Sequence, residues 1–408
     1  MSAEPELAGR VAQTIADAAG GPVLVLGSLP PHGRDLDILA RRPERERLER
    51  ALIARGYVRK GSTFALFDAC SAYGVELIDA EGYLRTDARD ELFAAARPLD
   101  SLPNLARPAP EHALIIMARL VCDEGRLGPK RIVRLRRIVA EDPYVWPRAR
   151  RVAAGWGDAA KLDLLEREAS GAGSQWPRRA LARLPARWSR RGVLVSLSGV
   201  DGCGKSSQAR WLQQAMTALG VPTDVVWNHL GGNFSLDLIR KPARLVFRLA
   251  RVPFEPMADF EDRGEADEAH PAGPVRDIWS SYVTASNSLE QRVHAIRSLV
   301  RGRVAVFDRG PLDLAVRMEV IYRGQVERQR RLVELAAPRP GLAFLLDISA
   351  ELSLQRKHDI WSSRQLREQS MTYRALAPRF GVRVLDGRRP PAELAAEIAQ
   401  AVWLKAPA

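Results

Sequence analysis

The sequence predicts a two-part α/β protein, in which a small α+β part with a helical extension precedes a mostly parallel β-sheet covered by helices. The chain has 408 residues, more than a single hydrophobic core usually serves. From residue 193 onward, strand-like apolar runs alternate with helical patterns, as in parallel sheets with helices on both faces. Residues 90–185 instead carry mainly helical patterns and few strand signals. We therefore expect domains at 1–175 and 192–408, joined by a basic linker at 176–191.

The composition favours a soluble cytoplasmic protein without a membrane or nucleic-acid partner. No run of 18 apolar residues occurs, and the N-terminus lacks a basic region followed by an apolar one. The formal net charge is +13, but only seven of the 62 basic residues are lysines, and the arginines are spread along the chain. This distribution is more typical of a GC-rich coding sequence than of a groove-reading surface. The cysteines Cys70, Cys122 and Cys203 lie far apart and predict neither a disulfide nor a zinc site.

One glycine-rich stretch carries the chemistry expected of the second part. The strand-like run 193–198 ends at Gly199, and Gly204, Lys205 and Ser206 complete the pattern G-x-x-x-x-G-K-[ST], the P-loop, before a helix begins. Glycines let successive backbone N–H groups face an anion, and the helix N-terminus adds its positive dipole end. We expect Lys205 to reach the β- and γ-phosphates of ATP and Ser206 to bind Mg²⁺. The expected nucleotide-binding residues here are Gly199, Asp201, Gly202, Cys203, Gly204, Lys205, Ser206 and Ser207.

The first part contains a second candidate site, built from carboxylates. Residues 1–20 predict a helix and residues 22–26 a strand, and the turn Gly27-Ser28 follows. In the run 35–39, Asp35 and Asp37 alternate with apolar residues and therefore share one face of a strand. Two such carboxylates can chelate Mg²⁺ in a two-metal phosphoryl or nucleotidyl transfer site, while a Gly-Ser turn can hold a triphosphate.

This segment resembles the nucleotidyltransferase superfamily, in which Gly-Ser precedes a carboxylate–apolar–carboxylate strand. The resemblance covers about residues 20–80 and implies a third metal-binding carboxylate on a later strand, for which Glu76 is the candidate and Asp79 the fallback. The order of elements agrees, because a predicted helix at 43–55 precedes the strand that carries Glu76. A degenerate domain that serves as a binding platform is the alternative, since only six residues, two of them prolines, separate Ser28 from Asp35.

Mainly helical patterns follow this segment. Helices are predicted at 111–123, 129–140, 146–156 and 158–170, and we assign them to the first domain as its helical extension. Residues 171–175 are the best linker candidate. The arginine-rich run 177–191 leads from there into the second domain, and we expect it to be a solvated linker helix.

The second part predicts four further strands beyond the helix that follows the P-loop. They are expected at 222–227, 304–308, 342–347 and 382–386. Helices are predicted at 236–251, 275–301 and 391–404, with an irregular insertion at 252–275 that is rich in proline and acidic residues. The strand at 304–308 ends in Asp308, which is the position for a Mg²⁺-associated or base-like acid in a parallel α/β sheet.

This second part resembles the thymidylate kinase family of the nucleoside monophosphate kinases over about residues 192–405. The residues that carry the resemblance are Ser198–Gln208, the strand-ending pair Asp308-Arg309, the run Leu346–Ala350 with Arg356-Lys357 soon after, and the turn Leu385-Asp386-Gly387. The resemblance implies that Asp308 and Arg309 lie beside the acceptor phosphate. It also implies a mobile lid whose arginines close over the donor phosphates, with Arg356 as a catalytic member and Arg364 as a nucleotide-binding one.

Three departures from the family pattern concern the acceptor. Gly310 stands where an aromatic residue is usual, Asn287 aligns with an arginine of the acceptor helix, and residues 228–232 lack an Arg-Glu-Pro-Gly run. We therefore expect an ATP- and Mg²⁺-dependent phosphotransferase with a small phosphate-accepting substrate that the sequence does not specify. The alternatives are a kinase for a sugar or natural-product intermediate, and a non-catalytic nucleotide-binding regulatory or toxin–antitoxin-like module. The sequence is also compatible with a homodimer.

Overall fold

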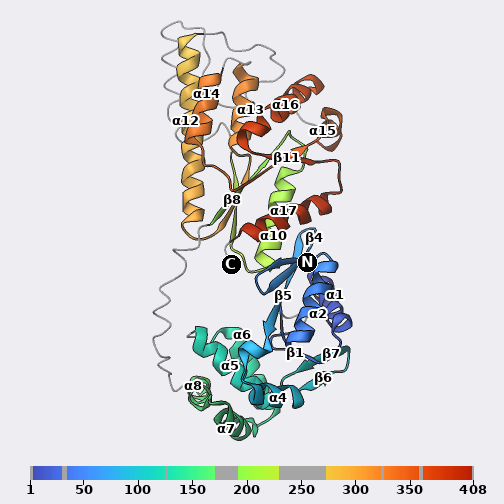
Figure 1. Cartoon of the computed structure of the whole chain (residues 1–408). Coiled ribbons are helices and arrows are strands. Elements are labelled where there is room, and N and C mark those ends of the chain that lie inside the picture. Colours follow the sequence, from blue (N-terminus) through green and yellow to red (C-terminus); the bar gives the residue numbers. More distant parts are fainter. Residues whose placement is uncertain are drawn as a thin grey trace. The chain divides into compact units, whose positions relative to one another are not determined.

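The computed structural model describes residues 3–29, 35–124, 127–170, 192–228, 273–322, 326–357 and 362–406 (Figure 1). They form two compact units, of which the first lies within residues 1–186 and the second consists mainly of residues 187–408. Both units combine helices with a β-sheet, so the α/β class is confirmed. The predicted linker at 176–191, the helix at 236–251 and nearly all of the insertion at 252–275 lie outside the described residues. Within the described ranges, every helix is too short or too polar to cross a membrane.

A seven-stranded mixed sheet forms the centre of the first unit, in the order β3-β4-β5-β2-β1-β7-β6. Its strands are β1 (Val23–Val25), β2 (Asp35–Ala40), β3 (Val58–Lys60), β4 (Thr63–Asp68), β5 (Ser71–Asp79), β6 (Arg97–Leu99) and β7 (Leu102–Arg107). The helices α1 (Ala3–Ala18) and α2 (Arg42–Ala54) confirm the predictions for residues 1–20 and 43–55. The apolar stripe of α1, including Leu7, Val11 and Ile15, is buried in one cluster with strand residues of this sheet.

The hairpin of β6 and β7 lies in the region for which the sequence predicted few strands. β7 runs parallel to β1, with Val23 opposite Leu105 and Leu24 opposite Ala106. The prediction therefore missed residues 97–107. This stretch contains proline and Asn104, which has a positive φ of 65°, so its local strand propensity is low. The pairing with β1 buries Leu105 and Ala106, and that tertiary contact stabilises the strand.

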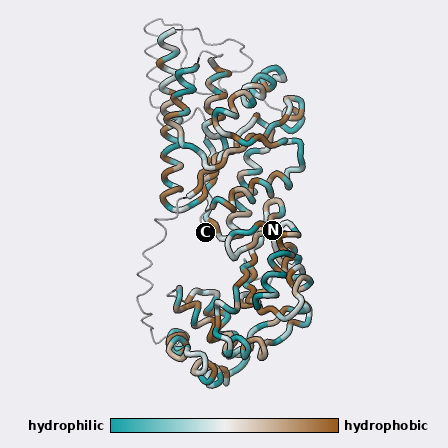
Figure 2. The backbone as a smooth tube through the Cα atoms, viewed as in Figure 1, coloured by the Kyte–Doolittle hydropathy of each residue, from teal (hydrophilic) through white to brown (hydrophobic). Residues whose placement is uncertain are grey.

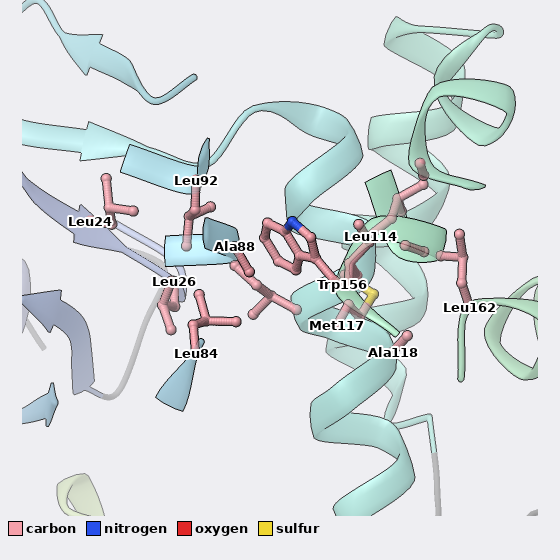
Figure 3. Close-up of a cluster of buried hydrophobic side chains, with 14 of the residues drawn as sticks. Leu24, Leu26, Leu84, Ala88, Leu92, Leu114, Met117, Ala118, Trp156 and Leu162 are labelled. Atoms are coloured by element: carbon pink, nitrogen blue, oxygen red, sulfur yellow. The ribbon is translucent and has the colours of Figure 1, made fainter. Parts of the chain in front are cut away.

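Five helices follow or flank this hairpin and pack on the sheet. They are α4 (Thr86–Ala94), α5 (Pro110–Glu124), α6 (Pro129–Glu141), α7 (Val145–Trp156) and α8 (Ala159–Ala169), and the last four confirm the predicted helical pattern. Their apolar residues share one cluster with Leu24 and Leu26 from the sheet. In Figure 3 the indole of Trp156 lies between Leu84 and Leu92 on one side and residues of α5 on the other. The helical extension thus shares a core with the sheet.

The second unit is built on a five-stranded sheet in which all strands are parallel, in the order β12-β11-β8-β10-β9. The strands are β8 (Val193–Ser198), β9 (Thr223–Trp227), β10 (Val304–Asp308), β11 (Leu342–Asp347) and β12 (Arg383–Asp386), which confirms the five predicted strands. They are largely apolar (Figure 2). This pattern is expected of strands that are covered on both faces.

The helices of the second unit cover both faces of this sheet. They are α10 (Lys205–Ala218), α12 (Pro274–Leu299), α13 (Pro311–Tyr322), α14 (Glu327–Ala336), α15 (Ala350–Arg356), α16 (Ser363–Leu376) and α17 (Pro391–Lys405). α10 leads outward from β8 to the edge strand β9, α12 leads back to β10, and α13 and α14 cross to β11 beyond β8. Because parallel crossovers are right-handed, this reversal puts α10 and α12 on opposite faces. The reversal makes the carboxyl end of β8 a topological switch point, where open α/β sheets bind ligands.

Trp156 provides a test of the core shared by sheet and helices in the first unit. Its side chain is buried, and its Nε1–H donates a hydrogen bond to Glu91 Oε2 at 2.8 Å. We expect Trp156→Ala to lower the free energy of unfolding of this unit by about 3–5 kcal/mol, because the cavity separates the sheet from α5. Trp156→Phe should cost clearly less, since it keeps most of the packing. Calorimetry of the full chain would measure both, and equal costs for the two variants would contradict the packing role.

Candidate functional site

The glycine-rich loop, residues Gly199–Gly204, joins the central strand β8 to α10. Gly199 has φ 145° and Gly202 has φ 77°, a region that favours glycine. A Cβ atom would lie 2.7 Å from Leu346 O at the first position and 2.8 Å from Ser353 O at the second. Both positions therefore require glycine, because φ is positive there and a carbonyl oxygen of another segment lies close to where a Cβ atom would be. The loop ends at the first turn of α10, whose N–H groups have no intrahelical partner.

Lys205 begins α10, and its ammonium group folds back over the loop. Nζ donates hydrogen bonds to Gly199 O at 2.7 Å and Val200 O at 2.9 Å, and it lies 3.8 Å from Asp201 Oδ1. The side chain is only 5% exposed. A buried ammonium group costs free energy unless it is hydrogen-bonded and paired. The loop carbonyls and Asp201 meet this requirement, so the positive charge is held inside the loop.

A hydroxyl and a carboxylate meet beside this loop. Ser206 Oγ donates a hydrogen bond of 2.5 Å to Asp308 Oδ2 at the end of β10. Asp308 is 3% exposed, and its other oxygen, Oδ1, is buried without a hydrogen-bond partner in the described part of the chain. Asn228 reinforces this strand end, since its N–H donates to Asp308 O and its Nδ2 to Arg309 O. The parallel pairing of β8 with β10 brings Ser206 and Asp308 together, although 102 positions separate them in the sequence.

Arg309 follows Asp308 in a left-handed conformation, with φ 75°. Its Nη2 contacts Asp201 Oδ1 at 2.5 Å, which places the guanidinium group over the glycine-rich loop. Burial disfavours the charged guanidinium, but Asp201 and neighbouring acidic groups raise the pKa of Arg309 above its usual value. Burial alone would raise the pKa of Asp201. The positive charges of Lys205, Arg309 and Lys357 lower it by more, so this pKa lies below its usual value. A positive φ at a non-glycine residue costs free energy, and such residues cluster at active sites and ligand-binding segments.

Asp313 belongs to this arrangement, although the sequence analysis did not single it out. It lies 1% exposed in the first turn of α13. Its carboxylate accepts hydrogen bonds from Gly310 N at 2.8 Å, Tyr373 Oη at 2.8 Å and Gly199 N at 3.4 Å. The sequence contains one indication of this role. Asp313 stands two positions after Pro311, and a carboxylate is favoured in the first turn of a helix that begins with proline.

The predicted lid residues are only partly brought to the loop. Arg356 Nη1 donates to Gly387 O at 3.2 Å, so its guanidinium group is directed to the turn after β12. Lys357 lies nearer the loop, because a Cβ at Gly202 would be 3.5 Å from Lys357 Cβ. Arg364 is exposed on α16. Of this adjacent pair, Lys357 and not Arg356 is the residue that lies beside the loop.

Gly310 and Asn287, two of the positions that depart from the resemblance, have defined surroundings. A Cβ at Gly310 would lie 2.0 Å from Ser196 Oγ, so no larger residue fits while Ser196 keeps this position. Asn287 is 3% exposed on α12, and its Nδ2 donates to Val283 O one turn earlier in the same helix. Arg292 is exposed and donates to Leu335 O. Gly310 is therefore closely packed against Ser196, and the amide of Asn287 is directed to its own helix.

In the first unit, strand pairing brings the predicted carboxylates into register. β2 runs parallel to β5, with Asp37 opposite Glu76, while Asp35 is opposite Gly74. Asp37 also lies against the Gly27-Ser28 turn, because a Cβ at Gly27 would be 2.8 Å from Asp37 Oδ2. Within the described ranges, no group of three or more His, Cys, Asp or Glu side chains is arranged to hold a metal ion.

Arginines of α6 supply positive charge next to these carboxylates. Arg134 Nη1 donates a hydrogen bond to Leu26 O, immediately before the Gly27-Ser28 turn. Burial, with Arg107 and Arg137, lowers the pKa of Arg134, while Asp37 raises it. Burial, Asp35 and Glu76 together raise the pKa of Asp37 to about 6, although Arg134 and Arg131 act in the opposite direction. Arg134 is not identifiable from the sequence, because only the fold brings α6 to the end of β1.

The chain matches no protein-family model, and no curated protein matches it at a significant level.

Asp37 predicts a pH dependence of stability for the first unit. Its pKa rises from 3.8 to about 6 on folding, so the folded state binds the proton more tightly than the unfolded state does. The resulting stabilisation is present below about pH 4 and is lost as the pH rises through 6. We expect the free energy of unfolding to fall by up to about 3 kcal/mol over this interval. Asp37→Asn should remove that fall, which thermal melts from pH 4 to 8 would measure.

The control for this experiment is Asp35→Asn, which removes an exposed carboxylate from the same strand face. It should raise stability at pH 8 slightly, through relief of repulsion, and leave most of the pH dependence. A pH profile that is unchanged in Asp37→Asn would contradict the assignment.

Proposed function

We propose that the second unit is an ATP- and Mg²⁺-dependent phosphotransferase that resembles the thymidylate kinase-like P-loop kinases. The observation that carries the proposal is the 2.5 Å contact between Ser206 Oγ and Asp308 Oδ2 beside the glycine-rich loop. A hydroxyl in the first helical turn after such a loop and a carboxylate at the end of a neighbouring strand are the side chains that hold Mg²⁺ in P-loop proteins. The loop follows the central strand at the switch point of the sheet, where ligands of α/β proteins bind.

The residues present fit the ion and the nucleotide that the proposal requires. Asp308 Oδ1 is a buried carboxylate oxygen without a hydrogen-bond partner in the described ranges, and such hard oxygens are the preferred ligands of Mg²⁺. Left-handed glycines and the orphan N–H groups of α10 suit phosphate oxygens. Bound Mg²⁺·ATP supplies the transferable phosphoryl group and neutralises part of its charge. Ser206 and Asp308 would hold the ion, and the loop would hold the phosphates.

Two basic residues have defined tasks in this proposal. Lys205 would exchange the carbonyls of Gly199 and Val200 for phosphate oxygens, which are the stronger acceptors for an ammonium group. Arg309 is fixed by Asp201 at 2.5 Å and points across the loop, where a guanidinium group can stabilise charge on the transferred phosphoryl group. Phosphoryl transfer depends mainly on such positioning and charge neutralisation.

A non-nucleotide acceptor, such as a sugar or natural-product intermediate, is the second candidate within this proposal. It is favoured by Gly310, which leaves no side chain to stack on a base, and by Asn287, whose amide is directed to its own helix. A thymine-specific pocket would need groups that these two positions do not supply. We therefore propose an acceptor other than thymidylate.

The first unit is proposed to be nucleotidyltransferase-like, with an activity that is separate from the kinase. The register of Asp37 with Glu76 and the contact of Asp37 with the Gly27-Ser28 turn support this proposal. Arg134 beside the turn offers a partner for a phosphate group. An inactive scaffold is the alternative, and Mg²⁺-dependent nucleotide transfer that disappears in Asp35→Asn/Asp37→Asn would distinguish the two.

ATP turnover by purified full-length protein tests the donor site. Lys205→Ala should leave the fold intact and reduce turnover ~10²–10³-fold, because one charge-assisted contact in the transition state contributes ~3–4 kcal/mol. Ser206→Ala should raise the Mg²⁺ concentration needed for half-maximal turnover. Lys405→Ala, which removes an exposed lysine bound to Gly341 O, is the matched control. A folded Lys205→Ala protein with unchanged turnover would exclude the proposed donor site.

An acceptor screen tests the class of substrate. We expect thymidylate and other nucleoside monophosphates to be poor acceptors and a phosphate-bearing or hydroxyl-bearing sugar to stimulate ATP consumption. Thin-layer detection of transferred radiolabel from γ-labelled ATP would identify the product. Efficient thymidylate phosphorylation would contradict the reading of Gly310 and Asn287. ATP binding without turnover for any acceptor would instead favour a non-catalytic regulatory module.

A further inference from the structure

A buried carboxylate beside the glycine-rich loop makes more contacts than the start of a helix requires. Asp313 lies in the first turn of α13, and Gly310 O accepts a hydrogen bond of 3.2 Å from Leu314 N, so Gly310 caps this helix. Asp313 Oδ2 accepts a hydrogen bond from Gly310 N at 2.8 Å, which is an ordinary contact between an acidic side chain and the residue that caps its helix. The other oxygen, Oδ1, is not needed for this contact, so its partners indicate a second role.

The partners of Oδ1 come from two other segments of the second unit. Tyr373 Oη on α16 donates a hydrogen bond to it at 2.8 Å, and Gly199 N in the glycine-rich loop donates one at 3.4 Å. Gly199 is buried, and the exposed fractions are 1% for Asp313 and 5% for Tyr373. A buried carboxylate costs free energy unless hydrogen-bond donors surround it. The tyrosine hydroxyl therefore helps to hold Oδ1 where it faces the loop.

The backbone groups that Asp313 binds are next to the two basic side chains of the candidate site. Gly199 O accepts a hydrogen bond from Lys205 Nζ at 2.7 Å. Gly310 directly follows Arg309, which has a left-handed φ of 75°. One carboxylate thus connects the backbone beside the ammonium group to the backbone beside the guanidinium group.

We infer that Asp313 is a positioning residue for phosphoryl transfer and that Tyr373 acts through it. The inference rests on the proposed function of the second unit. In this role Asp313 touches neither the nucleotide nor the acceptor. It holds the two glycines, and with them the two basic side chains, in the arrangement that transfer requires. Such positioning matters because a misplacement of about 1 Å can cost ~10²-fold in rate.

Steady-state kinetics of the full chain separate this role from a merely structural one. Tyr373→Phe should lower kcat about 10-fold and Asp313→Asn about 10–100-fold, while the KM for ATP stays within about threefold, because both variants keep the groups that bind the nucleotide. In the double variant, Tyr373→Phe should add less than about twofold to the effect of Asp313→Asn, since the hydroxyl acts through the carboxylate. Two effects that multiply, or a loss confined to KM, would overturn the inference.

The matched controls for these variants are Tyr144→Phe and Glu368→Gln. Tyr144 is 77% exposed in the first unit, and Glu368 is exposed on α16, the helix that carries Tyr373. Both controls should keep the kcat of the native chain. A loss of kcat in Glu368→Gln as large as that in Tyr373→Phe would overturn the specific role of the hydroxyl.

Hydrogen exchange followed by mass spectrometry tests the contacts of Asp313 without any turnover. In Asp313→Ala, peptides that contain Gly199 or Gly310 should exchange at least ~10-fold faster than in the native chain, because each N–H loses a charged acceptor. Peptides from α17 should exchange as before, which shows that the unit remains folded. Native exchange at both glycines would overturn the anchoring by Asp313. Faster exchange in a chain that transfers no phosphoryl group would instead overturn the proposed function, and with it the catalytic part of this inference.

Discussion

The buried carboxylate of Asp313 holds together three segments of the second unit that are far apart in the sequence. It accepts hydrogen bonds from the backbone of Gly199 in the glycine-rich loop, from the backbone of Gly310 after β10, and from the hydroxyl of Tyr373 on α16. Burial raises the pKa of Tyr373 well above its usual value, and Asp313 adds to the effect, so the hydroxyl keeps the proton that it donates. Asp313 therefore links the position of the loop to the turn that carries Arg309.

Charge is balanced differently in the two candidate sites. In the second unit, Asp201 is paired with Arg309 and lies near Lys205, so the acidic group keeps a lowered pKa despite its burial. In the first unit, Asp37 faces two other carboxylates, and its pKa is raised to about 6 even with Arg134 nearby. The site in the second unit is preorganised around neutralised charges. The site in the first unit holds excess negative charge, which a bound cation or a proton would relieve.

Residues close in sequence were sufficient to predict the strands of the second unit, the helices after β7 and the glycine-rich loop, because their periodicity and turn chemistry are local. The contact of Ser206 with Asp308 could be expected only in outline, since it needs two strands to lie side by side. Asp313, Arg134 and the strand β7 were not predictable in this way. Their roles depend on buried partners supplied by distant segments: a hydrogen-bonded turn for Asp313, the end of β1 for Arg134, and a neighbouring strand for Leu105. Tertiary structure decided them because burial and pairing, and not local preference, determine where such groups are stable.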